Sequence, residues 1–122
     1  MTAAALAACA LALVAAGCTT APAWERLPAS PLRLTAAPGK TVEQCFALAA
    51  GERVEYQFEA TGALDFNLHT HRGGEVVMPV KIPQIREQAG TFASPRREEY
   101  CMMWSNQSAV PVRISGEWRR LR

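Results

Sequence analysis

The chain has 122 residues, of which 13 are Lys or Arg and 11 are Asp or Glu, so its formal net charge is +2. This length fits one domain, and so small a positive charge excludes the broad basic surface of a nucleic-acid-binding protein. We therefore expect a single small domain with no nucleic-acid partner.

The first predicted element is an apolar signal helix over residues 1–17. These residues are almost wholly Ala, Leu and Val and carry no charged side chain. Seventeen residues are too few to span a bilayer comfortably, and the run ends at small residues, which is typical of a secretory signal. The alternative is a buried Ala-rich helix followed by an unmodified Cys18.

The end of this run, residues 14–18 with the sequence Val-Ala-Ala-Gly-Cys, resembles the lipobox of bacterial lipoproteins. In that family the signal is cut before the Cys, whose sulfur takes diacylglycerol and whose new amino group is acylated. Two features depart from the family pattern: Ala15 replaces the commoner Leu, and no Lys or Arg precedes the apolar run. The resemblance implies a lipid at Cys18, and Thr19 in place of Asp implies the outer membrane, facing the periplasm.

Residues 18–38 are predicted to be a flexible tether. Four prolines lie there among Ala, Ser and Thr, with no sustained apolar period. Such a segment favours extended conformations at roughly 3.1 Å per residue, so it could hold the domain up to about 60 Å from the membrane. We expect the folded domain to occupy residues 39–122.

From Gly39 onward the sequence predicts short strands separated by turn residues. Residues 53–60 alternate, with Val54, Tyr56 and Phe58 on one face and charged or amide side chains on the other, as half-buried strands do. Residues 64–71 alternate in the same way. The predicted strands are Thr41–Leu48, 53–60, 64–71, 75–82, 90–93, Glu98–Ser105 and 110–118.

The remaining segments complete this prediction. Pro79 cannot donate to a strand ladder, so strand 75–82 is expected to lie at an edge or to break there. Residues 83–90 are interpreted as a loop or one helical turn, and residues 119–122 as a solvated basic tail. The predicted fold is all-β, a small antiparallel β-sandwich of jelly-roll-like kind.

Cysteine usage supports a location outside the cytoplasm. Of the four cysteines, Cys9 leaves with the predicted signal and Cys18 carries the predicted lipid, which leaves Cys45 and Cys101 as a pair. An oxidising compartment allows such a pair to form a disulfide. Two buried free thiols are the alternative.

The order of features over residues 41–118 resembles the GOLD domain, the lumenal β-sandwich of eukaryotic vesicle cargo receptors. The features are an opening Cys45-Phe46, the alternating strands, Gly73-Gly74, residues 90–92 (Gly-Thr-Phe), and Tyr100-Cys101 with Asn106. In those receptors a disulfide joins the opening Cys to a Cys in a late aromatic strand, so the resemblance implies a Cys45–Cys101 disulfide. It also implies the fold and an inclination to bind proteins. The receptors' transport role does not follow, because their transmembrane helix and cytoplasmic tail are absent here.

The most chemical feature of the sequence is the His69-x-His71 pair. Residues i and i+2 of a strand share a face about 6.5–7 Å apart, so the two imidazoles could share a copper or zinc ion. A stable site needs three or four ligands, and no second ligand motif appears. Other side chains considered for the site are Glu75, across a turn, and Met78, Met102 and Met103, which suit copper(I).

We favour a simpler interpretation, in which the polar face of strand 64–71 is an exposed recognition surface. Asp65, Asn67, His69 and His71 share the face opposite Leu64, Phe66 and Leu68. Both interpretations predict that the two histidines are exposed.

Catalysis finds little support in the sequence. There is no Gly-x-Ser-x-Gly turn, and neither histidine has an evident Ser or Cys nucleophile. Asp65 and Glu75 could form a carboxylate pair, but nothing places them at glycosidase separation. The predicted function is a lipid-anchored, non-enzymatic envelope protein that binds an envelope protein partner or a ligand and holds no cofactor. The alternatives are a periplasmic copper or zinc binder and a small envelope hydrolase.

Overall fold

The computed structural model describes residues 17–18 and 23–122, and its regular structure consists of strands. Every pairing between them is antiparallel, so the predicted all-β antiparallel fold is confirmed. The predicted signal helix falls on residues outside the described part of the chain. The six strands are β1 (Ser30–Ala36), β2 (Thr41–Leu48), β3 (Arg53–Arg72), β4 (Glu75–Ala93), β5 (Glu98–Ser105) and β6 (Val112–Leu121).

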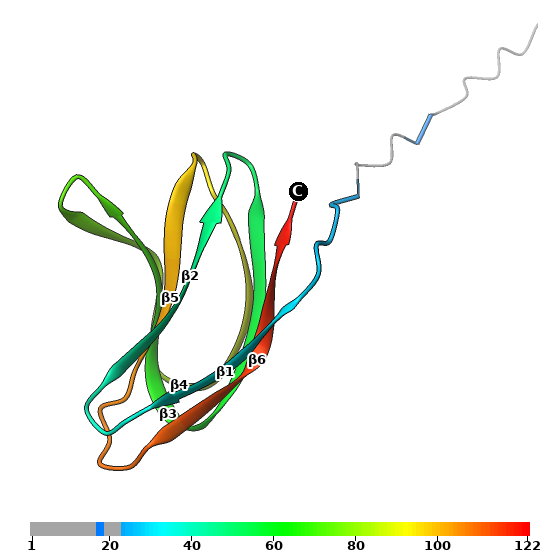
Figure 1. Cartoon of the computed structure of the whole chain (residues 1–122). Helices are drawn as coiled ribbons and strands as arrows, with labels where there is room; N and C mark the ends of the chain where they lie inside the picture. The colour runs from blue at the N-terminus through cyan, green and yellow to red at the C-terminus, as the bar shows by residue number, and fades with distance from the viewer. Residues whose placement is uncertain (1–16, 19–22) are drawn as a thin grey trace, which may run out of the picture.

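Strand β3 organises the fold because it belongs to two half-sheets. It pairs with β4 along its length, while its other edge pairs with β6 over residues 53–60 and with β5 over residues 65–69. The change of partner falls at residues 61–63, where the register with β4 also shifts. The single sheet therefore curls on itself, with β1 and β6 on one side and β5 and β2 on the other (Figure 1).

The core lies between these half-sheets and follows the predicted alternation. Val54, Tyr56, Phe58, Leu64, Phe66 and Leu68 of β3 are all buried in it. Phe58 meets the Trp104 ring of β5 edge-on, with ring centroids 5.4 Å apart. Phe46 of β2 stacks on Trp118 of β6 at 4.9 Å, and such aromatic pairs add stabilisation beyond their buried area. These pairs hold the two half-sheets together.

The folded part begins earlier than the sequence predicted. Strand β1 lies within the expected tether and pairs with β6, and the amide of Glu25 already donates to the Arg122 carbonyl at 2.7 Å. The physical reason is an apolar alternation hidden among the prolines, because Leu32 and Ala36 are buried in the core. The prediction of a flexible tether over residues 18–38 is therefore wrong from Glu25 onward.

Two further expectations are corrected at strand ends. Residues 83–90 belong to β4 rather than to a loop, and the strand tolerates its prolines because it pairs only with β3 in the described part of the chain. The basic residues 119–121 belong to β6, where Leu121 is buried. Within residues 17–18 and 23–122 there is no helix with the length and apolarity needed to span a bilayer.

Candidate functional site

The Cys45–Cys101 disulfide lies on the outer face of the sheet. The two residues stand directly opposite each other in β2 and β5 and are bonded, with Cα atoms 4.0 Å apart. Phe46 and Tyr100, the next residue of β2 and the preceding one of β5, point the other way into the core. Cys45 is exposed, whereas Cys101 is buried. The predicted disulfide is thus present, and solvent can reach it at Cys45 but not at Cys101.

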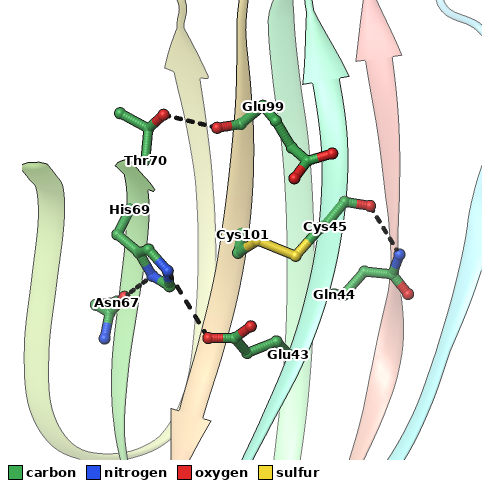
Figure 2. Close-up of a disulfide and its surroundings, with 8 residues drawn as sticks. All are labelled: Glu43, Gln44, Cys45, Asn67, His69, Thr70, Glu99 and Cys101. Atoms are coloured by element: carbon green, nitrogen blue, oxygen red, sulfur yellow. Dashed lines mark hydrogen bonds and ion pairs between the residues drawn. A yellow bond between two sulfur atoms is a disulfide. The ribbon is translucent and has the colours of Figure 1, made fainter. Parts of the chain in front are cut away.

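His69 lies against this disulfide, as Figure 2 shows. It is the residue of β3 opposite Cys101, its Nδ1 is 2.8 Å from Asn67 Oδ1, and its Nε2 is 3.7 Å from Glu43 Oε1. The ring of His71 meets the His69 ring edge-on at 5.2 Å. Three adjacent strands therefore bring an imidazole, a carboxylate and a disulfide sulfur to one place.

The predicted exposure of both histidines is half right. His71 is exposed, but His69 is only 4% exposed, so that part of the prediction is wrong. Alternation placed His69 on the outer face correctly, yet the disulfide, Asn67 and Glu43 stand beside it there and remove it from water. Asn67 is also buried.

Asp65 has a separate role from the histidines. Its Oδ1 accepts hydrogen bonds from the Gln84 backbone amide at 3.0 Å and the Gln84 side chain at 2.8 Å, and its Oδ2 accepts one from Gln107 at 2.7 Å. These hydrogen bonds, those from Gln84 first, lower the pKa of Asp65. Gln84 has a φ of 51°, so Asp65 holds a bulge of β4 in a conformation that side chains rarely adopt. Of the four residues expected to form one surface, the structure brings Asn67, His69 and His71 together and gives Asp65 other partners.

Of the other suggested metal ligands, Met103 lies beside this cluster, opposite Asn67 of β3 and Glu43 of β2, whereas the remaining ones lie elsewhere. Glu75 pairs with Arg72 at the end of the β3–β4 hairpin, Met102 is in the core, and Met78 is 41% exposed on the β4 edge. Among the described residues, the ligand atoms of Glu43, His69 and Cys101 do lie within 4.8 Å of one another, although Cys101 is in the disulfide.

Sequence reasoning missed an ionic clamp at the turn end of the β3–β4 hairpin, where Arg72 is the last residue of β3. The Arg72 guanidinium donates to both carboxylate oxygens of Glu98, at 2.7 and 2.9 Å, and the Tyr100 hydroxyl donates to the same carboxylate at 2.8 Å. Arg72 first, and then Tyr100, lower the pKa of Glu98 to about 2. Nothing in the sequence pairs Arg72 with Glu98, which lies 26 residues later.

Next to this clamp, the β4 strand of the hairpin exposes apolar side chains where it pairs with β3 residues 70 and 71. The tip of the hairpin, drawn in green in Figure 1, projects from the sheet. Val76 is 50% and Met78 41% exposed, and their strand β4 has a free edge. We call Val76, Val77 and Met78 the apolar hairpin edge. The sequence signal was an apolar run without alternation, which predicted the strand but not its exposure.

A shallow groove of about 550 Å³ lies elsewhere, on the outer face where β3, β4 and β6 meet. Its lining includes Gln57, Glu59, Glu87 and Ser115 and contains no His or Cys. This arrangement offers polar contacts, with Ser115 of β6 directly opposite Glu59 of β3.

Comparisons with known proteins report only the fold. No family model and no curated protein matches the sequence. The structure is similar to the crystal structure of Aeromonas hydrophila PliG, a periplasmic lysozyme inhibitor of g-type lysozyme, at 15% identity over 77% of this chain and 86% of that one, with a TM-score of 0.51. It is also similar to a de novo designed double-stranded β-helix solved by NMR, at 19% identity over 75% of this chain and 97% of that one, with a TM-score of 0.43.

Proposed function

We propose that this chain is a cell-envelope protein that faces the periplasm, is anchored by a lipid on Cys18, and binds a protein partner without catalysing a reaction. The observation that carries the proposal is the apolar hairpin edge. Large apolar side chains rarely gather on the exposed part of a monomer unless they meet another molecule.

The chemistry of the hairpin edge favours a protein partner that contacts side chains. A free strand edge can pair with another chain, but Pro79 has no amide hydrogen and Lys81 places a charge on the same edge. Both residues oppose the addition of a strand. We therefore expect Val76 and Met78 to fill apolar depressions of a folded partner.

The envelope location rests on independent supports. The lipobox resemblance ends at Cys18, which is exposed, and disulfides such as Cys45–Cys101 persist in oxidising compartments. The resemblance to the GOLD domain adds an expectation of protein binding. PliG, which has a similar fold, is a periplasmic inhibitor of a lysozyme, so enzymes that cut the cell wall are the first partner class to test. This last step is an analogy of fold.

The proposed anchor would hold the domain close to the membrane. Glu25 is already hydrogen-bonded to the end of the chain, so only residues 19–24 separate it from Cys18. Six extended residues span about 20 Å, instead of the roughly 60 Å expected for a longer tether. The partner should therefore lie at the membrane surface.

The test is capture of the partner from envelope extracts with the mature, lipidated protein. Val76→Glu combined with Met78→Glu should abolish capture while leaving the melting temperature within about 3 °C, because both residues are about half exposed to solvent. Val110→Glu is the matched control, since Val110 is 62% exposed outside the hairpin. A g-type lysozyme, assayed for inhibition, tests the analogy with PliG.

Three outcomes would contradict the proposal. Undiminished capture by the double variant would remove the hairpin edge from the interface, and equal loss with Val110→Glu would show that any added charge disturbs binding. An unmodified Cys18 on mature protein found free in the periplasm would refute the anchor.

A further inference from the structure

The side chains beside the Cys45–Cys101 disulfide form a group of possible metal ligands that lies apart from the apolar hairpin edge. Glu43 of β2, His69 of β3 and Cys101 of β5 offer three ligand atoms within 4.8 Å of one another. Cys45 is bonded to Cys101 and stands directly opposite it. We infer that reduction of this disulfide creates a Zn²⁺ site made of Cys45, Cys101, His69 and Glu43.

The geometry of His69 is that of a zinc ligand. Asn67 Oδ1 can only accept, so the 2.8 Å contact fixes the proton on Nδ1 and leaves the Nε2 lone pair free. Metal-binding histidines usually donate their other N–H in this way, which sets the tautomer and the ring orientation. The Nε2 atom points toward Glu43, as Figure 2 shows.

The spacing suits a tetrahedral ion. His69 Nε2 and Glu43 Oε1 are 3.7 Å apart, which is long for a hydrogen bond. Two ligand atoms each about 2.0–2.2 Å from a tetrahedral zinc lie roughly 3.3–3.6 Å apart. A small rotation of the exposed Glu43 side chain would bring both atoms to that spacing.

The oxidised protein lacks half of this donor set. With the sulfurs bonded to each other, only His69 and Glu43 remain, and a stable zinc site needs three or four ligands. A dithiol reductant supplies two electrons and two protons, so the S–S bond breaks, two thiols form and the reductant becomes a disulfide. Zn²⁺ then displaces the two thiol protons and binds both thiolates. Because Cys45 is the exposed half of the bond, the reductant can reach it.

This site differs from the His-x-His pair predicted by the sequence. His71 is exposed, and its ring meets His69 edge-on, so it is not needed as a ligand. Metal occupancy in the new site would follow the redox state of the disulfide, which no pair of histidines could provide.

The test measures Zn²⁺ affinity of the full mature protein, oxidised or reduced with a phosphine, by competition with a chromogenic chelator. The reduced protein should bind one Zn²⁺ at least about 100-fold more tightly than the oxidised protein, since two thiolates are added. His69→Ala and Glu43→Gln should each weaken binding by about 10–100-fold, and Asn67→Ala by about 10-fold through loss of ring orientation. His71→Ala is the matched control and should bind as the wild type does.

Reduction of the disulfide could unfold the domain, so the folding of the oxidised and reduced proteins is followed by circular dichroism with and without Zn²⁺. Refolding of the reduced protein by Zn²⁺, absent in His69→Ala, would support the site because binding would then drive folding. Equal affinity of the oxidised and reduced proteins would overturn the inference. So would binding that is unchanged in His69→Ala, which would assign the ion to the two thiols alone. Failure here leaves the proposed partner binding untouched, because the hairpin edge is a separate surface.

Discussion

The stabilising effect of the disulfide can be isolated by replacing its exposed half. Cys45→Ala removes the cross-link but little packing, because Cys45 is exposed. The bond joins residues 56 positions apart. Closing a loop of that length lowers the entropy of the unfolded chain by an amount worth about 4 kcal/mol at 25 °C. That is a large share of the roughly 5–15 kcal/mol that stabilises a typical domain.

The assay is thermal unfolding followed by circular dichroism in buffer that contains a chelator. One kcal/mol shifts the melting temperature of a domain this size by about 4–8 °C, so Cys45→Ala should melt about 15–30 °C below the wild type. Reduced wild type should match it. Cys101→Ala should melt lower still, because its sulfur is covered on the outer face. A Cys45→Ala protein that melts within about 3 °C of the wild type would refute the reasoning.

Three further predictions concern single side chains. The pKa of Glu98 is lowered to about 2 from an unperturbed 4.5, so as the pH falls this carboxylate is protonated in the unfolded chain before it is protonated in the folded one. The free energy of unfolding should therefore decrease as the pH drops from about 4.5 to 2. Glu98→Gln should flatten this dependence on pH. Gly116→Ala should cost about 3 kcal/mol or more in urea unfolding, because a Cβ there would overlap the Gln57 backbone carbonyl. His69→Ala should cost about 1–3 kcal/mol by leaving its buried amide partner unpaired, whereas His71→Ala should stay within about 0.5 kcal/mol.

Each of these predictions has an outcome that contradicts it. An acid transition unchanged in Glu98→Gln would assign the titration to another carboxylate. A Gly116→Ala protein as stable as the wild type would show that β6 can move away from β3. Equal costs at the two histidines would mean that burial of His69 contributes nothing.

The sequence predicted most of the strands because alternation is a local signal. In β3 every second residue from Val54 to Leu68 is apolar except Gly62, and these apolar side chains point into the core or pack against it. Residues 61–63 were interpreted as a boundary between strands. In the structure they are the point where one continuous strand exchanges β6 for β5 as its neighbour. The alternation of apolar residues in β3 does not indicate which neighbouring strand it pairs with, so the exchange of β6 for β5 could not be predicted from it.

The site was less predictable because its members are distant in sequence. Glu43 and His69 are 26 residues apart, and only the order of strands brings β2, β5 and β3 side by side. Alternation assigned His69 to the correct face but could not show which side chains would cover it. Pro79 predicted an edge position or a break for its strand, and the structure confirms the edge position, because β4 pairs only with β3 in the described part of the chain.

The shared strand β3 has a consequence for how the molecule opens. Strand β3 supplies hydrogen-bond partners to both half-sheets. If β3 separates from β5 or from β6, the core between the half-sheets is exposed to solvent. We expect slow amide hydrogen exchange to report one cooperative unit, with β3 amides near Val54 and Phe66 protected by the same free energy. The end of the β3–β4 hairpin, where Val76 and Val77 pair with His71 and Thr70, lies past the last β3–β5 pair, His69 with Cys101. We expect its amides to exchange through local fraying, so the surface proposed to meet a partner can adjust its shape while the body of the sheet stays closed.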